Sequence, residues 1–269
     1  MKKLLLILVL SFFFISCENK TKKVSENIIT ERQKREAKKT IDSNEISENC
    51  IMSFCNFAKI VDKDGYVNVR EKGNVSSNVI GKIKSGDVVY IFEDLQTEWL
   101  NVDFKDENNR EFNGYIHRSR IKYINTLENI PSVIDDENGV NFILRDIVVE
   151  IKTDKFNYEQ NKKYFSEMQR EDFVVQKYKG EKMWGTDGTV PKTYYKSITI
   201  TIGKTTTKIL EKEIDDLFNP NNNYAECYFD KIDNSLYLHL SNSDGAGSYV
   251  ALLEIKNGEY LGRQVEIPF

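Results

Sequence analysis

Apolar and polar residues follow three different patterns along this chain. Residues 4–15 are a run of 12 almost entirely apolar positions that follows Lys2 and Lys3. Residues 18–48 contain no aromatic residue but carry eight Lys or Arg and seven Asp or Glu. From residue 59 onward, short stretches alternate apolar and polar positions between turn residues, which is typical of half-buried β-strands. The chain therefore divides into an apolar leader, a charged segment and a mainly β remainder.

Residues 59–124 are predicted to contain about five strands. Val67 and Val69 alternate with polar neighbours, and residues 88–92 are rich in β-formers. Residues 99–102 add a further apolar and polar run, and Gly and Asp mark the turns between these stretches. So many short strands in so few residues indicate a small β-barrel.

The remainder of the chain is also predicted to be rich in strands. Ile198, Ile200 and Ile202 alternate with threonines, as a half-buried strand requires. Asn257-Gly258 stands between two such runs and is the strongest short signal for a hairpin. An antiparallel meander is the expected result.

Two helices and a linker are expected in the same region. Residues 126–138 are polar, contain Pro131 and are interpreted as a linker. Residues 154–169 are predicted to form a helix with Asp154 as its N-cap, because they place Phe156, Tyr164, Phe165 and Met168 among polar residues. Residues 211–218 are predicted to form a shorter helix. Residues 139–269 are therefore expected to be an α+β domain.

Charge and composition exclude some functions. Without Lys2 and Lys3, the chain has 36 basic residues (38 less two) and 42 acidic ones, a net charge of −6. Nucleic acid is not an expected partner, because it requires a concentrated basic surface. His117 and His239 are the only histidines, too few for a His-based metal site, while a mixed-ligand site stays open. No catalytic residue and no cofactor are predicted, since the chain has no Gly-x-Ser-x-Gly elbow, and a pairing of Cys227 with His239 would require a nucleophile within a strand.

The cysteines are assigned separately. In an exported protein, Cys50 and Cys55 can close a small disulfide loop, and the alternative is that both are free thiols in apolar surroundings. Cys227 lies between Ala225 and Phe229 in an alternating run. It is therefore predicted to be a core residue of a strand.

The start of the chain resembles that of bacterial lipoproteins. A basic start, an apolar run and a small residue before Cys17 are typical of a secretory signal. The run is roughly 18 Å long as a helix, whereas the hydrocarbon core of a bilayer is about 30 Å, so it is not expected to span a membrane. Phe14, Ile15, Ser16 and Cys17 resemble the lipobox, with Phe14 where Leu is usual.

The lipobox resemblance implies that residues 1–16 are removed, that Cys17 carries lipid and that the protein is anchored in the bacterial cell envelope, on the periplasmic or outer-membrane side. Ordinary signal cleavage is the alternative. It prefers small residues one and three positions before the cut, and Phe14 is large. Residues 17–57, which include the charged segment, would then be a tether, because mixed charge with few apolar residues and no aromatic residue over 18–48 does not favour folding.

A second resemblance concerns the bacterial SH3-like domain. Four ordered blocks carry it, namely residues 64–70, 77–88, 98–102 and 114–119. They mark a domain over residues 58–125, about a quarter of the chain. This chain departs from the family at Tyr66, where Leu is common, at Tyr115, where Trp is common, and in the polar insert 105–112.

The SH3-like resemblance implies a binding function. Domains of this family often dock cell-wall peptides or glycans, although many have no known ligand. The candidate ligand-binding residues are Trp99, Tyr115, Tyr66 and Tyr90, because aromatic side chains on small barrels stack on extended chains. For each of them, packing within the barrel is the alternative.

Two Gly-rich loops each carry one carboxylate, Asp187 in residues 184–188 and Asp244 in residues 242–247. A functional interpretation would bring the two carboxylates together as a cation site or an acid–base pair. The preferred interpretation is that each Asp-Gly forms a tight turn.

Taken together, the sequence predicts a membrane-anchored envelope lipoprotein that is non-catalytic. Its SH3-like module is expected to bind cell-wall peptide, glycan or a protein partner. The alternatives are a cell-wall-modifying enzyme targeted by the SH3-like domain, and an envelope inhibitor or immunity-type protein. The C-terminal region resembles envelope proteins of uncharacterised role, to which no activity can be attached.

Overall fold

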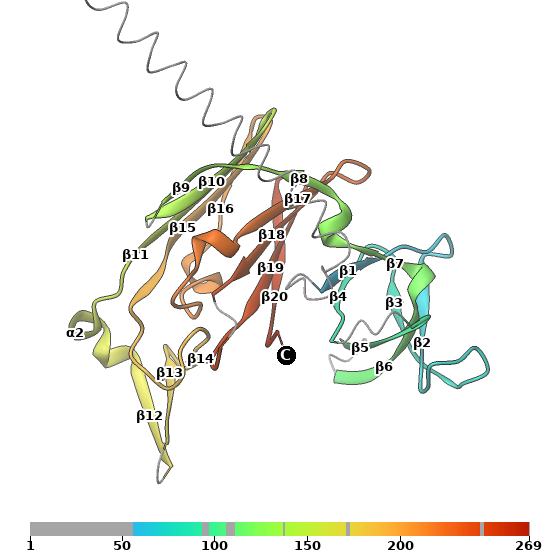
Figure 1. The fold of residues 1–269 in the computed structure, drawn as a ribbon, viewed down its shortest axis with the longest axis horizontal. Coiled ribbons are helices and arrows are strands. Elements are labelled where there is room, and N and C mark those ends of the chain that lie inside the picture. The colour runs from blue at the N-terminus through green and yellow to red at the C-terminus, as the bar shows by residue number, and fades with distance from the viewer. Residues whose placement is uncertain are drawn as a thin grey trace, which may run out of the picture. The chain divides into compact units, whose positions relative to one another are not determined.

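The structure is a computed structural model, and it describes residues 56–92, 97–105, 111–136, 138–170, 173–242 and 245–268. The predictions about the signal, Cys17, the disulfide of Cys50 and Cys55, Asp244 and the tether up to residue 55 concern residues outside these ranges, whereas Phe57, the last residue assigned to the tether, begins β1. Residues Phe54–Phe269 form one unit of the chain by their contacts. The described residues are mainly β, as predicted, with several antiparallel sheets and one short α-helix (Figure 1).

The described residues between 56 and 126, called the first half below, form seven strands in two antiparallel sheets. One sheet has the order β4-β1-β7 and the other β3-β2-β6-β5. Among the described residues the two sheets do not close into a barrel. The elements are β1 (Phe57–Ile60), β2 (Tyr66–Arg70), β3 (Val79–Lys84), β4 (Val88–Tyr90), β5 (Trp99–Lys105), β6 (Glu111–His117) and β7 (Ile121–Tyr123), with 3-10 helices η2 (Arg118–Arg120) and η3 (Ile124–Thr126).

The alternation in the sequence builds the core of this half. Val67 and Val69 on β2 are buried, whereas Asn68 between them is half-buried. Leu100 and Val102 on β5 are buried in the same core. One set of alternate side chains therefore packs inside, which leaves the intervening polar side chains for the surface.

The second half contains two five-stranded antiparallel sheets and a three-stranded one. Their orders are β16-β15-β11-β10-β9, β20-β19-β18-β17-β8 and β12-β13-β14. The elements are β8 (Glu128–Ile130), β9 (Ser132–Asp136), β10 (Gly139–Leu144), β11 (Ile147–Lys155), α2 (Tyr158–Asn161), η4 (Lys162–Tyr164), β12 (Phe165–Arg170), β13 (Phe173–Tyr178), β14 (Glu181–Lys182), β15 (Thr193–Ile202), β16 (Thr205–Lys208), η5 (Glu211–Glu213), η6 (Asn222–Tyr224), β17 (Glu226–Asp230), β18 (Ser235–Ser241), β19 (Val250–Lys256) and β20 (Glu259–Glu266).

The two five-stranded sheets share one apolar core. Ile198 and Ile200 of β15 are fully buried in it together with Leu238 of β18, so the predicted half-buried strand is confirmed. The predicted hairpin at Asn257-Gly258 is also confirmed, because β19 pairs with β20 and both turn residues have positive φ, 53° and 81°. Cys227 lies in the same core on β17, as predicted.

The helix predicted over residues 154–169 is wrong. Asp154 belongs to β11 and binds Lys196 at 2.8 Å, and the N-cap of the four-residue α2 is Asn157. The aromatic residues that suggested a helical face belong to a cluster instead, since the ring of Phe156 packs edge-on against those of Phe165 and Phe218. Beyond Tyr164 the chain forms the β12–β13 hairpin.

Two other segments differ from expectation. Of residues 211–218, expected to be a short helix, only Glu211–Glu213 form a 3-10 turn. Residues 126–138, expected to be a linker, contribute two strands: β8 pairs with β17, and β9 pairs with β10. Pro131 lies between them, where its missing N–H costs no ladder bond, while Ile130 is fully buried in the core.

Strand β18 is buried on both faces. Its leucines face the core between the five-stranded sheets, and Tyr237 on the other face joins a cluster with Phe57 of β1 and Tyr90 of β4. Lys59 of β1 extends this contact, with Nζ 3.0 Å from a carboxylate oxygen of Asp230. The two halves are therefore packed against each other through β1.

Candidate binding groove

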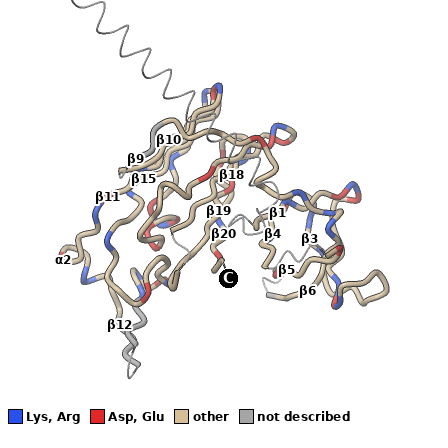
Figure 2. Tube along the Cα trace, viewed as in Figure 1, with Lys and Arg blue, Asp and Glu red and all other residues tan. Residues whose placement is uncertain are grey.

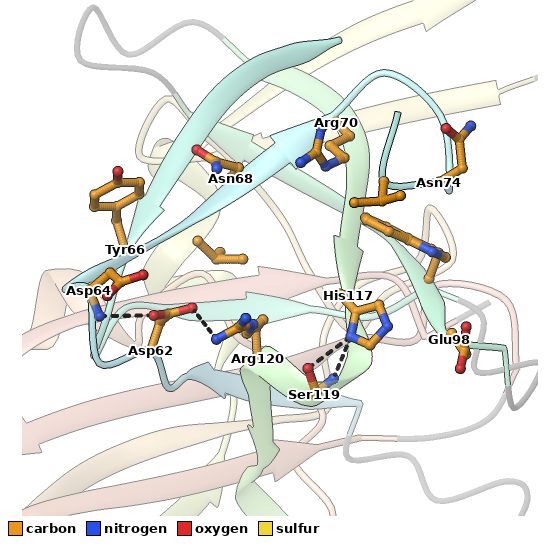
Figure 3. A pocket seen from close by; sticks show the side chains of 13 residues that line it. Asp62, Asp64, Tyr66, Asn68, Arg70, Asn74, Glu98, His117, Ser119 and Arg120 are labelled. Carbon is orange, nitrogen blue, oxygen red and sulfur yellow. Dashed lines mark hydrogen bonds and ion pairs between the residues drawn. The ribbon is translucent and has the colours of Figure 1, made fainter. Parts of the chain in front are cut away.

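A groove of about 620 Å³ lies on the first half of the described chain. It is formed by the turn before β2, by β2 and the loop after it, by the start of β5 and by the end of β6 with η2. Its lining combines two aromatic residues with charged and amide side chains (Figure 3). The lining residues are Asp62, Asp64, Tyr66, Val67, Asn68, Arg70, Asn74, Val75, Glu98, Trp99, His117, Ser119 and Arg120.

One end of the groove is held by Asp62. Its carboxylate accepts a hydrogen bond from the backbone N–H of Asp64 at 2.9 Å and pairs with Arg120 at 3.0 Å (Figure 3). The side chain of Asp62 is 6% exposed, so this pair is shielded from water on the Asp side. Asp62 therefore fixes the turn that precedes β2, and Tyr66 and Asp64 lie at this end.

The other end is formed by the junction of β6 and η2. Nδ1 of His117 accepts the backbone N–H of Ser119 at 3.3 Å and lies 2.8 Å from the Ser119 hydroxyl. Because a backbone N–H can only donate, Nδ1 acts as the acceptor in this contact. The ring of His117 also packs edge-on against Trp99, with centroids 5.2 Å apart.

Arg70 and Gly73 hold Trp99 in place. The guanidinium of Arg70 lies 6.0 Å from the Trp99 ring and donates to the carbonyl of Ser77 at 2.7 Å. A Cβ on Gly73 would lie 3.0 Å from Cβ of Trp99. The loop after β2 thus passes close over Trp99, and a larger residue than glycine would press against the indole.

The structure separates the four aromatic candidates. Tyr66 and Trp99 both line the groove; Tyr66 is 37% exposed and Trp99 is half-buried. Tyr115 is half-buried and lies within reach of Gly73, but it does not line the groove. Tyr90 is 2% exposed within an apolar cluster, which leaves it no surface for a ligand.

Sequence reasoning missed most of the polar lining. Asp62, Asp64, Glu98 and Arg120 come from turns and strand ends, where charged residues usually serve only solubility. The available signal was position, because Asp64 and Glu98 each open one of the blocks that resemble the SH3-like family. Grouping the polar residues that open those blocks would have found Asp64 and Glu98, but not Asp62 and Arg120.

The residues singled out in the second half do not form a catalytic pair. Cys227 pairs with Leu238 across β17 and β18, whereas His239 pairs with Glu226, so the thiol and the imidazole lie on opposite faces of the sheet. Burial raises the pKa of the Cys227 thiol, which makes it a poor nucleophile. The dyad is thereby excluded, and Asp187 is an exposed residue of its loop.

Across the described ranges there is no group of three or more His, Cys, Asp or Glu that could hold a metal ion. None of the helices in the part of the chain that the structure describes is long and apolar enough to cross a membrane. Acidic and basic residues are mixed along the chain rather than gathered by sign (Figure 2).

Comparison with protein-family models, with curated proteins and with solved structures finds no match to this chain. The chemistry of the groove must therefore be argued from its own residues.

Proposed function

We propose that this protein is a lipid-anchored envelope protein whose SH3-like module binds an extended chain of the cell wall without cleaving it. The observation that supports this function most strongly is the groove itself. It lies on the blocks that resemble the SH3-like family, and it offers Tyr66 and Trp99 together with polar groups along one open surface. Such a surface suits an extended ligand held by stacking and hydrogen bonds.

The arrangement of the groove argues for binding rather than catalysis. The His117 imidazole is engaged by Ser119, and the Asp62 carboxylate is engaged by Arg120. An acid–base pair needs groups that are free to exchange a proton with a substrate. His117 and Asp62 therefore serve to hold the groove in shape, which favours recognition of a ligand over catalysis by these two groups.

Binding is tested with the full chain in detergent and purified cell-wall sacculi. Tyr66→Ala is expected to weaken retention on sacculi about tenfold, because one aromatic contact is worth about 1–3 kcal/mol. Tyr164→Ala is the matched control. Tyr164 is 41% exposed, as against 37% for Tyr66, and each ring has one lysine ammonium within 5 Å, Lys163 at 4.8 Å and Lys82 at 3.9 Å. Equal retention of the two variants would count against the groove.

Anchoring is tested at Cys17. We expect Cys17→Ala to move the protein from the membrane fraction to the soluble envelope fraction, and globomycin to block its processing. Cys227→Ala is the control, since Cys227 is buried in a strand and has no part in anchoring. Unchanged fractionation of Cys17→Ala would exclude lipid attachment at this residue.

A further inference from the structure

The charged groups of the groove differ in whether the protein already uses them. Asp62 is paired with Arg120, and Arg70 donates to the carbonyl of Ser77 and lies over Trp99. The cations that line the groove are therefore held by partners within the protein. An anionic ligand would have to compete with these partners.

Two carboxylates are not used in this way. Among the described residues, no hydrogen-bond or ion-pair partner contacts the side-chain oxygens of Asp64 or Glu98. Asp64 is exposed beside Tyr66, and Glu98 is exposed at the opposite end of the groove, near His117 (Figure 3). Each end of the groove thus presents one open carboxylate.

The aromatic lining adds to the same preference. Tyr66 lies two residues from Asp64, and Trp99 directly follows Glu98. Each ring already has one cation of the protein near it, Lys82 3.9 Å from the Tyr66 ring and Arg70 6.0 Å from the Trp99 ring, so a ligand ammonium must displace that cation or approach the ring from another side. Aromatic faces and carboxylates are the groups that bind an ammonium ion in proteins.

We propose that the groove selects a peptide that carries a free side-chain amine, and that Asp64 and Glu98 are the residues that recognise it. This inference rests on the proposed function, because it names the ligand class of the same groove. The hydroxyls of a neutral glycan can donate hydrogen bonds to the two carboxylates, but only an ammonium group adds the attraction between opposite charges. The chain that the groove binds is therefore peptide rather than sugar.

The test measures binding of three soluble probes to the full chain in detergent, at 0.15 M salt, by titration calorimetry. The first is a lysine-containing tetrapeptide with a blocked amino terminus, the second is the same peptide with its lysine amine acetylated, and the third is chitotetraose. We expect the free amine to bind at least tenfold more tightly than either of the others. Raising the salt concentration to 0.5 M is expected to weaken binding of the free-amine peptide, since the contact is between exposed charges.

Variants assign the selectivity to residues. Glu98→Gln and Asp64→Asn are each expected to weaken binding of the free-amine peptide about fivefold and to leave binding of the acetylated peptide unchanged. Glu181→Gln is the matched control, an exposed carboxylate of β14 outside the groove, and is expected to change neither.

The outcomes separate this inference from the proposed function. Equal binding of the two peptides, or tighter binding of chitotetraose, overturns the amine preference while retention on sacculi still supports wall binding. Failure of all three probes and of sacculi overturns both.

Discussion

Residues 56–126 expose charged side chains along an open groove, whereas residues 128–268 enclose several of theirs beneath β-sheets. Asp64 and Glu98 in the groove have no partner among the described residues, while Asp230 in the second half is 5% exposed and bound to Lys59. A buried charge without a partner is costly, and an exposed one is not. Asp64 and Glu98 are therefore open to a ligand, whereas Asp230 serves the fold.

The strongest test of this comparison is the charge cluster around Lys59. Its ammonium lies 3.0 Å from Asp230 and 2.6 Å from Asp233, and Asp233 also binds Lys256 at 3.1 Å. We expect Lys59→Met to lower the free energy of unfolding by about 3 kcal/mol, because it leaves the carboxylate of Asp230 buried and unpaired. Chemical unfolding in urea measures the change.

Lys256→Met is the control for this cluster. The side chain of Lys256 is 39% exposed, and it binds Asp233 but not Asp230. Loss of its ammonium is therefore expected to lower the free energy of unfolding by less than about 1 kcal/mol. Asp230→Asn in the Lys59→Met background should recover most of the loss, since it removes the stranded charge. Equal effects of the two lysine variants would contradict the distinction between enclosed and exposed charges.

The cluster also predicts a dependence on pH. Burial raises the pKa of Asp233, but hydrogen bonds from Lys59 and Lys256 outweigh burial and hold the pKa below its ordinary value. A carboxyl whose pKa is lower in the folded protein contributes stability above its unfolded pKa, and this contribution is lost as the pH falls through the folded value. Lys59→Met should therefore show a smaller loss of stability on acidification than the unchanged chain.

The sequence alone predicts more of the fold than of the groove. Alternation over Val67 and Val69 predicts β2, and Asn257-Gly258 predicts the last hairpin, because both signals are local. The helix over residues 154–169 was predicted from aromatic spacing, but those side chains pack with Phe218, distant in sequence. Local patterns cannot reveal such a partner.

The same limit applies to the groove. Tyr66 and Trp99 belong to blocks that resemble the SH3-like family, and both line the groove. Tyr90 lies two residues after one of these blocks, but the packing of β1 and β4 against the second half buries it in a cluster with Tyr237. The burial of Tyr90 depends on its contact with Tyr237, which lies almost 150 residues later in the chain.

A smaller effect is expected at His239, whose two ring nitrogens are among several buried polar atoms of the second half without a hydrogen-bond partner in the described part of the chain. Its side chain is 1% exposed, and neither ring nitrogen has a hydrogen-bond partner among the described residues, with the nearest carboxylate oxygen, of Glu226, 3.5 Å from Nδ1. The ring lies 6.1 Å from that of Phe57. We expect His239→Phe to raise the free energy of unfolding at pH 8 by about 1 kcal/mol, because it removes unsatisfied polar groups and keeps an aromatic ring.

Urea unfolding of His239→Phe measures this change, with His117→Phe as the matched control. His117 uses its Nδ1 to hold Ser119, so its replacement removes a hydrogen bond and is expected to lower stability. A loss of stability in both variants would show that the imidazole of His239 is needed where it lies.

The smallest effect is expected at Glu128, which forms a surface ion pair with Arg145 in the second half. Hydrogen bonds from Arg145 and then Lys231 lower the pKa of its carboxyl to about 2. The pair contributes to stability above the unfolded pKa of about 4.3, and the contribution is lost as the pH falls toward 2. Because the pair is exposed, we expect Arg145→Gln to raise the titration midpoint of Glu128, followed by carboxyl NMR, without a measurable change in the unfolding midpoint at pH 7. A clear loss of stability at pH 7 would mean that exposed charges also hold this half together, and that the contrast with the groove is one of degree.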